Sequence, residues 1–536
     1  LINGLPLVQI ELKRRGIDMK EAFDQIKRYK NHSYNGLYRF IQLFVISNGV
    51  DTKYFANGDQ ELNYGFTFYW TDINNDRITN LEQFCTFFLD RCHIAKMIAR
   101  YMIINETEKM LMVMRPYQVY AVESIVDRAI NTSNNGYVWH TTGSGKTITS
   151  FKTSQILSLE PSINQVFFLV DRKDLDKQTL DEFNKFNPGC VDMTNETFKL
   201  VQQIKDSTKP LIITTIQKMA NACSNPRYAS VMEKYKDKKT IFIIDECHRS
   251  QFGDMHKAIV HNFKKYHLFG FTGTPIFEEN AGNQKQTTAD IFEAADIFEK
   301  CLHTYLIKDA INDGNVLGFS VDYVKTIESN IDDSNDERVQ AIDTDEVFVD
   351  DTRIIMIAQH IIDHHNIKTR DRKYNSLFAV SSIPMLTKYY DTFKKLDHNL
   401  KIGAIFTFGA NLDNKEEHSR DTLERIIKDY NKMYNTNFTT NNFDAYFRDV
   451  CKKIKNTDID IVIVVDMLLT GFDAKRLNTL YIDKPLKFHS LIQAFSRTNR
   501  VESDTKPFGN IVCYDLPSKF RVDEAVKLFS QTDRTD

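Results

Sequence analysis

The sequence feature that most constrains the fold of this chain is an apolar segment followed by a loop of small residues. Residues 138–140 read as a strand, and the loop at 141–145 leads into Lys146 and Thr147 at the start of a helical pattern. Backbone N–H groups in such a loop, with the N-terminus of the following helix, favour a bound anion. We therefore expect Lys146 to reach the β- and γ-phosphates of a nucleotide and Thr147 to hold Mg²⁺. The first position of the eight-residue pattern would be glycine and is His140 here.

The overall composition is that of an ordinary globular protein. At ~150 residues per domain, 536 residues predict about three domains. The formal net charge of -3 does not indicate nucleic-acid binding, but a local basic groove would be enough for it. No apolar run approaches the ~20 residues of a membrane span. The eight cysteines lack zinc-site spacing, so we expect reduced thiols in a cytoplasmic protein.

A second candidate site lies near the start of the sequence. Residues 5–13 alternate as a strand does, which places Glu11 and Lys13 on one face. A Glu-x-Lys pair is half of a metal-dependent nuclease site, in which the carboxylate holds Mg²⁺ and the lysine orients or activates the attacking water. In the helical pattern that follows, Gln25 and Tyr29 are four apart and share one helix face.

Two alternatives for this region stay open. Glu-x-Lys alone is more often a solvated strand face, and the Gln-x-x-x-Tyr that follows favours the nuclease. Such a site needs a second carboxylate, usually an aspartate on a preceding strand, which we expect in a missing N-terminal part. Cys85, Cys92 and His93 could suggest a metal cluster, but no fourth ligand is evident, so we expect them to pack in the core.

After the phosphate loop, apolar runs alternate with helical patterns. Continuous apolar runs at 165–170, 211–215 and 240–244 are typical of strands buried on both faces of a parallel sheet. The last run ends in Asp245 and Glu246, which can hold the Mg²⁺ of a nucleotide and activate the hydrolytic water, respectively. The alternation predicts a doubly wound parallel sheet with its ligands at the carboxyl edge.

A second series of buried strands follows in the later half of the sequence. It begins at 376–380 and includes 460–465. Beyond it, the segment 489–500 contains Arg497 and Arg500, which we expect on one helix face because they are three apart. In a motor with two lobes, they would stabilise the charge on the transferring phosphoryl group. The alternative is a pair of surface arginines.

In sequence order, these pieces resemble the motif series of superfamily 2 helicases and translocases. The resemblance implies that Gln118 reads the adenine edge and that Thr272 and Thr274 couple hydrolysis to movement. The nucleotide contacts expected are Gln118, Thr142, Gly143, Ser144, Gly145, Lys146, Thr147 and Asp473. The expected nucleic-acid track consists of Arg172, Thr214, Thr215, Ser381, Ser382 and Thr470.

Taken with the nuclease residues, the stretches 139–147, 245–251, 270–275 and 493–500 resemble one family, the restriction (motor) subunit HsdR of type I restriction–modification enzymes. The resemblance implies an ATP- and Mg²⁺-dependent translocase of double-stranded DNA and an endonuclease that cuts unmodified DNA remote from its recognition site. It implies modification (methyltransferase) and specificity subunits as partners. The expected catalytic residues are Glu11, Lys13, Gln25, Tyr29, Glu246, Arg497 and Arg500, and the expected metal ligands are Glu11, Thr147 and Asp245.

The expected fold is α/β. A PD-(D/E)xK-type endonuclease domain that lacks its N-terminal part would span 1–105, and two RecA-like parallel-sheet lobes would span 106–300 and 301–536. A C-terminal helical domain for assembly is expected to be absent. The main alternative is a strand-separating superfamily 2 helicase with a vestigial nuclease domain. A non-catalytic assembly module is disfavoured by the intact Lys146 and Glu246.

Overall fold

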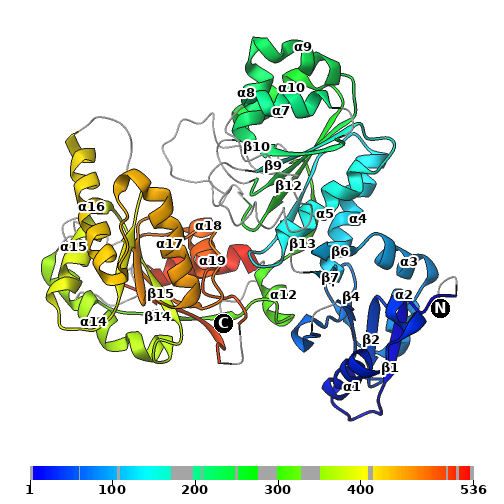
Figure 1. Cartoon of the computed structure of the whole chain (residues 1–536), viewed down its shortest axis with the longest axis horizontal. Coiled ribbons are helices and arrows are strands. Elements are labelled where there is room, and N and C mark those ends of the chain that lie inside the picture. Colours follow the sequence, from blue (N-terminus) through cyan, green and yellow to red (C-terminus); the bar gives the residue numbers. More distant parts are fainter. Residues whose placement is uncertain are drawn as a thin grey trace. The chain divides into compact units, whose positions relative to one another are not determined.

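The computed structural model divides the chain into two compact units (Figure 1). One comprises Leu1–Thr141 with Gly145–Tyr305, and the other comprises Thr142–Ser144 with Leu306–Asp536. The residues that the structure describes are 4–58, 61–105, 109–170, 197–206, 209–247, 252–275, 298–326, 350–407, 414–502, 505–514 and 518–530. Within these ranges, none of the helices combines the length and the hydropathy needed to cross a bilayer.

The N-terminal part of the first unit is built on a three-stranded sheet in the order β1-β2-β3. The strands are β1 (Val8–Leu12), β2 (Leu43–Ser47) and β3 (Thr52–Ala56). The first two are parallel and the last two antiparallel, so α1 (Met19–His32) is the crossover between β1 and β2. Its apolar face, including Phe23 and Ile26, is buried against β2 and β3. The predicted alternation of β1 is confirmed, although Ile10 and Leu12 on its other face are 41% and 57% exposed.

Short elements follow this sheet and lead to the first parallel sheet. They are η2 (Tyr64–Phe66), the hairpin of β4 (Trp70–Thr71) and β5 (Arg77–Ile78), α2 (Leu81–Phe88), α3 (Arg91–Ala99), and the hairpin of β6 (Met102–Asn105) and β7 (Met110–Val113), whereas η1 (Gly36–Phe40) lies earlier, between α1 and β2. His93 packs edge-on against Trp70, with ring centroids 4.7 Å apart, whereas Cys92 is exposed. The core packing expected for these side chains therefore holds for His93 and is wrong for Cys92.

The first six-stranded sheet has the order β10-β9-β11-β12-β8-β13, and all of its pairings are parallel. Its strands are β8 (Gly136–His140), β9 (Gln165–Val170), β10 (Leu211–Thr215), β11 (Thr240–Asp245), β12 (Tyr266–Thr272) and β13 (Cys301–Tyr305). The three apolar runs form β9, β10 and β11, whose side chains are largely buried, on both faces of the sheet in β9. The predicted doubly wound sheet is confirmed.

The helices of this part of the chain precede the first strand of the sheet or lie between its parallel strands. They are α4 (Pro116–Asn131), α5 (Lys146–Ser158), α7 (Thr197–Lys205), α8 (Ile216–Ser224), η3 (Pro226–Tyr228), α9 (Ala229–Met232), η4 (Glu233–Tyr235) and α10 (Phe252–Asn262). In Figure 1, α7, α8, α9 and α10 gather beside β10. Loops with polar residues follow the carboxyl ends of β8, β11 and β12.

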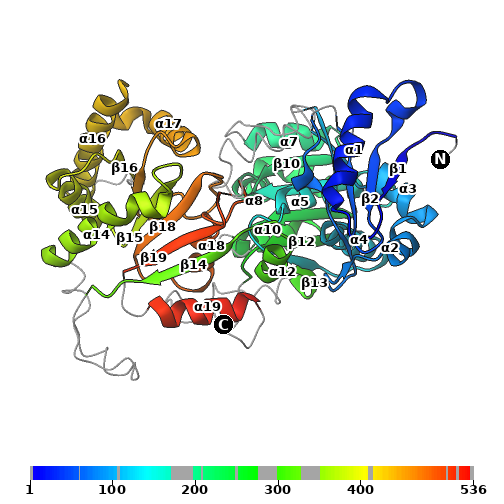
Figure 2. The same ribbon diagram turned by 90° about the horizontal axis from the view of Figure 1, so that it is seen from below.

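The second unit contains another six-stranded parallel sheet, in the order β14-β19-β18-β15-β17-β16 (Figure 2). Its strands are β14 (Gly318–Tyr323), β15 (Asn375–Val380), β16 (Ile402–Ile405), β17 (Ile461–Val464), β18 (Leu477–Asp483) and β19 (Phe508–Cys513). Its helices are α12 (Ile307–Asn312), α14 (Asp351–Thr369), α15 (Ile383–Lys395), α16 (Asn414–Tyr434), η6 (Thr440–Asn442), α17 (Phe443–Asn456), α18 (Phe488–Phe495) and α19 (Ser518–Ser530). The predicted fold class, with two parallel-sheet lobes, is confirmed, while the domain limits stay a prediction.

Candidate active sites

The phosphate loop follows β8 and requires glycine at two positions. Gly143 and Gly145 have φ angles of +90° and +82°, in the left-handed region that residues with a Cβ rarely adopt. A Cβ atom on Gly145 would lie 2.9 Å from Nε2 of Gln118, so Gln118 lies directly against the loop. Helix α5 then begins at Lys146, as the sequence predicts. The loop therefore directs the N-terminus of a helix at the place where a phosphate would bind.

Lys146 meets one of the two predicted carboxylates. Its side chain is buried, and its Nζ is 3.6 Å from Oε1 of Glu246. Glu246 has a φ of +50°, which is unusual for a residue other than glycine and turns the chain sharply where β11 ends. The Glu246 N–H donates to Oδ1 of Asp245 at 3.1 Å. Lys146 and both acidic residues are thus brought together at the carboxyl edge of the sheet.

The two threonines expected to couple hydrolysis to movement lie on the strand between β8 and β11. Thr272 is the last residue of β12, and Thr274 follows it by two residues. Both are fully buried, and the Thr274 N–H donates to Oγ1 of Thr272 at 3.1 Å. Because β12 pairs with β11 and with β8, these threonines lie between the strand that carries Asp245 and the strand that leads to the loop.

The residues predicted to line a nucleic-acid track have different surroundings. Thr214 and Thr215 end β10 and are buried, and Thr215 caps α8 by accepting from the Lys218 N–H at 3.1 Å. In the second unit, Ser382 caps α15, while Ser381 and Thr470 are exposed. Arg172, also predicted for the track, lies outside the described residues. Capping accounts structurally for Thr215 and Ser382, and exposure leaves Ser381 and Thr470 accessible.

Arg497 and Arg500 do not share a helix face, so that prediction is wrong. Helix α18 ends at Phe495, and the side chains of Ser496 and Thr498 donate to carbonyls of its last turn at 2.7 and 2.9 Å. Arg497 is buried, and its Nε and Nη1 donate to the carbonyls of Gln493 and Phe472 at 3.0 and 2.5 Å. The Nε and Nη1 donors of Arg497 are therefore directed at the backbone of its own unit.

Arg500 forms an ion pair with Asp473, a residue predicted to contact the nucleotide. Its Nε donates to Oδ1 of Asp473 at 2.7 Å. Burial raises the pKa of the Asp473 carboxyl, but the neighbouring Arg500 guanidinium outweighs this and leaves the pKa below its ordinary value. Asp473 is therefore ionised at neutral pH and fixes the direction of Arg500.

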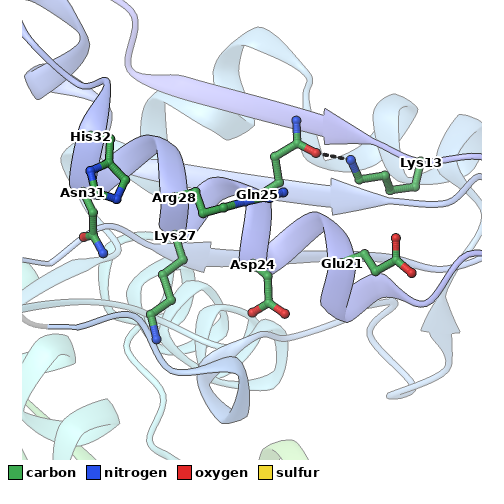
Figure 3. A pocket seen from close by; sticks show the side chains of 8 residues that line it. All are labelled: Lys13, Glu21, Asp24, Gln25, Lys27, Arg28, Asn31 and His32. Atoms are coloured by element: carbon green, nitrogen blue, oxygen red, sulfur yellow. Dashed lines mark hydrogen bonds between the residues drawn. The ribbon is translucent and has the colours of Figure 1, made fainter.

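The nuclease residues form one chain of hydrogen bonds. Nζ of Lys13 is 3.3 Å from Oε1 of Glu11. It also donates to Oε1 of Gln25, as Figure 3 shows, and Nε2 of Gln25 donates to the Tyr29 hydroxyl. The crossover by α1 makes this possible, because it brings the Gln25 face of the helix next to the end of β1. The structure thus brings together the Glu-x-Lys and Gln-x-x-x-Tyr residues.

Beside this chain lies a hollow of about 490 Å³. Most of its lining comes from α1, and the residues are Lys13, Glu21, Asp24, Gln25, Lys27, Arg28, Asn31 and His32 (Figure 3). Arg28 and His32 were not among the residues predicted from the sequence. Their spacing of three and seven residues from Gln25 continues one helix face, and this is the signal that would have found them.

The donor sets of the two predicted metal sites differ. The Thr147 hydroxyl and the Asp245 carboxylate are oxygen ligands of the type that Mg²⁺ uses beside a nucleotide phosphate. At the nuclease centre, Glu11 is the carboxylate closest to Lys13 for which the structure gives a contact. One or two carboxylates with water suffice for Mg²⁺, so Glu11 fits one ligand position.

Three family models match the chain. The SWI2/SNF2 ATPase model matches residues 117–351, and the model of the type I restriction enzyme R protein N terminus matches residues 1–62. The model of type I restriction enzyme subunit R domain 3 matches residues 372–516. The matched segments follow the order of the nuclease residues, the first sheet and the second sheet.

Individual relatives decide the family. The type I restriction enzyme SauCOLORF180P endonuclease subunit of Staphylococcus aureus (strain COL) is 56% identical over 550 residues, which cover 100% of this chain and 58% of the relative. A Mycoplasma pneumoniae protein, the C-terminal part of the endonuclease subunit of the putative type I restriction enzyme MpnIIP, is 39% identical over 202 residues, covering 97% of that protein and 35% of this chain. This chain belongs to the type I restriction enzyme R subunit family. The predicted family is confirmed.

This member of the R subunit family spans about 58% of the length of the staphylococcal relatives that it matches. Among solved structures, the ATP-dependent type ISP restriction-modification enzyme LlaBIII bound to DNA aligns with a TM-score of 0.50 at 16% identity. The alignment covers 78% of this chain and 30% of that enzyme. At this identity the likeness concerns the fold alone, and it agrees with the RecA-like lobes predicted from the sequence.

Proposed function

We propose that this protein is an ATP-dependent translocase of double-stranded DNA and an endonuclease within a type I restriction enzyme. It hydrolyses ATP at the phosphate loop, pumps DNA, and cuts unmodified DNA remote from the recognition site. The observation that carries the proposal is the contact of Lys146 with Glu246 at the carboxyl edge of a parallel sheet. The same chain presents the Glu11–Lys13 pair of a nuclease. ATP and Mg²⁺ are the proposed cofactors, and the cytoplasm is the proposed location.

ATP hydrolysis starts from the ion pair between Lys146 and Glu246. When a nucleotide enters, the Lys146 ammonium moves to the β- and γ-phosphates, because they carry more negative charge than one carboxylate. The released Glu246 carboxylate then accepts a proton from the attacking water. Thr147 and Asp245 would hold Mg²⁺, which supplies neutralisation of phosphate charge when it is bound.

The two arginines take different roles in this proposal. Arg500 keeps Nη1 without a hydrogen-bond partner among the described residues, while Asp473 holds its Nε. A buried guanidinium with an unused donor suits the stabilisation of charge on a transferring phosphoryl group. Arg497 instead supports the backbone around Phe472, so we assign catalysis to Arg500 and structural support to Arg497.

At the nuclease centre, Lys13 is the residue that the other side chains position. Gln25 accepts a hydrogen bond from Lys13 Nζ and is itself held by Tyr29. This keeps the ammonium beside Glu11, where it can orient an attacking water. Glu11 would hold Mg²⁺, which polarises the phosphodiester when it is bound.

The proposed partners are duplex DNA and the modification and specificity subunits. Family membership implies a subunit of a larger enzyme. We therefore assign recognition of the target sequence to another subunit. The motor needs contacts to the DNA backbone only, and such contacts carry no sequence information.

Steady-state ATP turnover tests the motor half of the proposal. The R subunit would be assembled with its modification and specificity partners and supplied with duplex DNA. We expect DNA-stimulated hydrolysis that Lys146→Ala abolishes and that Lys199→Ala, an exposed substitution on α7, leaves unchanged. On a forked duplex we expect no release of the displaced strand. ATP turnover by Lys146→Ala would refute the phosphate-loop assignment, and strand release would favour a helicase.

A further inference from the structure

Two histidines form a buried pair at the base of the phosphate loop. His140 ends β8 and is 0% exposed, and His303, in the neighbouring strand β13, is 5% exposed. Nε2 of His140 lies 3.0 Å from Nδ1 of His303, and the rings cross at 80°. His140 occupies the first position of the loop pattern, where glycine would be expected. The pair therefore joins the first loop residue to a side chain 163 residues further along the chain.

Aromatic rings surround the pair, and burial keeps both imidazoles neutral. Tyr117 contacts His140 edge-on, Tyr120 stacks on His303, and Tyr305 contacts His140 from β13. Burial lowers the pKa of His303 to about 4 and that of His140 well below its ordinary value, and the ammonium of Lys146 lowers the latter further. At neutral pH one ring therefore donates and the other accepts, so the tautomer of each imidazole depends on that of the other.

Packing alone does not account for this pair. Nδ1 of His140 and Nε2 of His303 are buried and have no hydrogen-bond partner among the described residues. A buried polar atom without a partner is unfavourable, and two apolar side chains of the same size would avoid that cost. The pair is thus retained at the expense of stability, in the way that functional polar groups often are.

The backbone around the histidine pair shows which part of the phosphate loop the pair holds in place. The N–H of Thr141, the second loop position, donates to the carbonyl of Tyr305 at 2.8 Å. Among the described residues, β13 is an edge strand whose neighbour in the sheet is β8. The register between the two strands shifts between Cys301 and His303, so the ladder is irregular just where the imidazole bond lies. The side-chain bond holds the two strands together at that point.

We propose that His303 is a positioning residue for ATP hydrolysis and acts through His140 on the phosphate loop. By holding His140, it fixes the backbone from which the loop N–H groups point toward the phosphates. This inference rests on the proposed hydrolysis of ATP at the loop. It assigns a role to His303, which lies outside the phosphate-binding pattern, and to His140, which stands at the first position of that pattern.

A pair of substitutions separates the hydrogen bond from packing. His303→Asn places an amide near the position of Nδ1 and can retain the bond to His140, whereas His303→Phe keeps the ring against Tyr120 and removes the bond. We expect His303→Phe to raise the KM for ATP and lower kcat at least tenfold in the assembled enzyme. We expect His303→Asn to remain within threefold of wild type. His140→Phe combined with His303→Phe should be no worse than either alone.

A matched control is His267→Phe. His267 is also buried in the first sheet, stacks on Phe269 and is hydrogen-bonded to the Thr132 carbonyl, at the end of β12 away from the loop. This variant should lose thermal stability and keep the KM and kcat of wild type. If His303→Phe does not fold, His303→Gln replaces it, because its longer side chain displaces the amide from the position that His303→Asn preserves.

Wild-type kinetics for His303→Phe, or equal losses for His303→Asn and His303→Phe, would overturn the inference. The second result would mean that ring packing, and not the hydrogen bond, matters. Failure of the proposed function gives a different result from failure of this inference. If the proposed function were wrong, the wild-type protein would not hydrolyse ATP, or Lys146→Ala would still hydrolyse it.

Discussion

At the scale of single residues, opposite charges meet at the end of the phosphate loop. Lys146 is buried and contacts Glu246, and the backbone at Glu246 adopts a left-handed conformation to make that contact. Left-handed backbone at a residue with a Cβ costs about 1–3 kcal/mol, which the surrounding structure must offset. Glu246 is therefore placed by the turn after β11 for a role that a relaxed turn would not serve.

Glu246→Gln separates nucleotide binding from hydrolysis. Binding of ATP must break the contact between Lys146 and Glu246, and a neutral amide competes less well for the ammonium. We expect this variant to bind ATP as tightly as wild type or more tightly, and to hydrolyse it about 10²–10⁴-fold more slowly. Calorimetric titration and steady-state turnover measure the two effects. Weaker binding at unchanged kcat would contradict the role given to Glu246.

The neutral state of His303 makes the fold sensitive to acid. Its pKa is about 4 in the folded chain because of burial, against about 6.5 in an unfolded chain. Between these values the unfolded chain binds more protons, so the free energy of unfolding rises with pH and falls as the solution is acidified. At pH 5.5 His303 accounts for a loss of about 1.4 kcal/mol relative to pH 7.5 or above.

Urea unfolding at pH 7.5 and pH 5.5 measures this loss. Replacement by an amide removes the titrating group, so His303→Asn should lose about 1.4 kcal/mol less than wild type over this interval. Equal losses for the variant and wild type would show that His303 is not held neutral by the fold.

At the scale of elements, the nuclease centre depends on the crossover of α1. The helix carries Gln25 to the end of β1 and buries Phe23 and Ile26 on its other face. The alternation of residues 5–13 and the helical spacing of the next segment predicted the strand and the helix, but not the parallel crossover that brings Gln25 to the end of β1. The sequence did not show that Ile10 and Leu12 are exposed, because a strand pattern does not tell which face is covered.

Gln25→Ala tests the chain of hydrogen bonds at this helix. Loss of the Gln25 amide frees Lys13 from its fixed position, so we expect DNA cleavage to fall at least about tenfold, as for other misplaced catalytic groups. ATP turnover should not change. Lys20→Ala, on an exposed position of the same helix, is the control and should cut normally. Normal DNA cleavage by Gln25→Ala would show that Gln25 does not contribute to the nuclease site.

Beyond the end of α18, Arg497 and Arg500 make different contacts, although the sequence predicted the same role for both. Arg497→Ala leaves the Phe472 carbonyl without its guanidinium partner, and the free energy of unfolding should fall by about 1–3 kcal/mol. Arg500→Ala removes an arginine that is paired with the half-exposed Asp473, so its effect on stability should be smaller. Its ATP turnover should fall about 10³-fold or more.

Thermal unfolding and turnover of the two variants give the comparison. Full activity of Arg500→Ala, or a stability loss larger than that of Arg497→Ala, would reverse the assignment.

Elements with continuous apolar runs could be predicted, and contacts between distant side chains could not. The strands β9, β10 and β11 follow from their buried residues alone. Helix α18 ends just before Ser496, and the side chains of Ser496 and Thr498 donate hydrogen bonds to its last carbonyls. No glycine or proline at this point of the sequence indicates that the helix ends there. The bond between His140 and His303 depends on which strand lies next to β8, and spacing in the sequence carries no information on that.

At the scale of the whole molecule, the chain carries the residues that we propose for a nuclease and for a motor. The first unit contains the Glu11–Lys13 pair and the phosphate loop lysine, and the second contains a parallel sheet of its own and Arg500, in the loop between α18 and β19. The central claim is that cleavage depends on ATP hydrolysis, since the nuclease acts on DNA delivered by the motor.

Cleavage of circular DNA tests this claim most directly. The complete R subunit, with its modification and specificity partners, would be given a plasmid that carries one unmodified site, with and without ATP. We predict cutting only when ATP and Mg²⁺ are both present, and none by Glu11→Ala or by Lys146→Ala. Glu11→Ala should still hydrolyse ATP at the wild-type rate. Cutting without ATP, or by Glu11→Ala, would contradict the account.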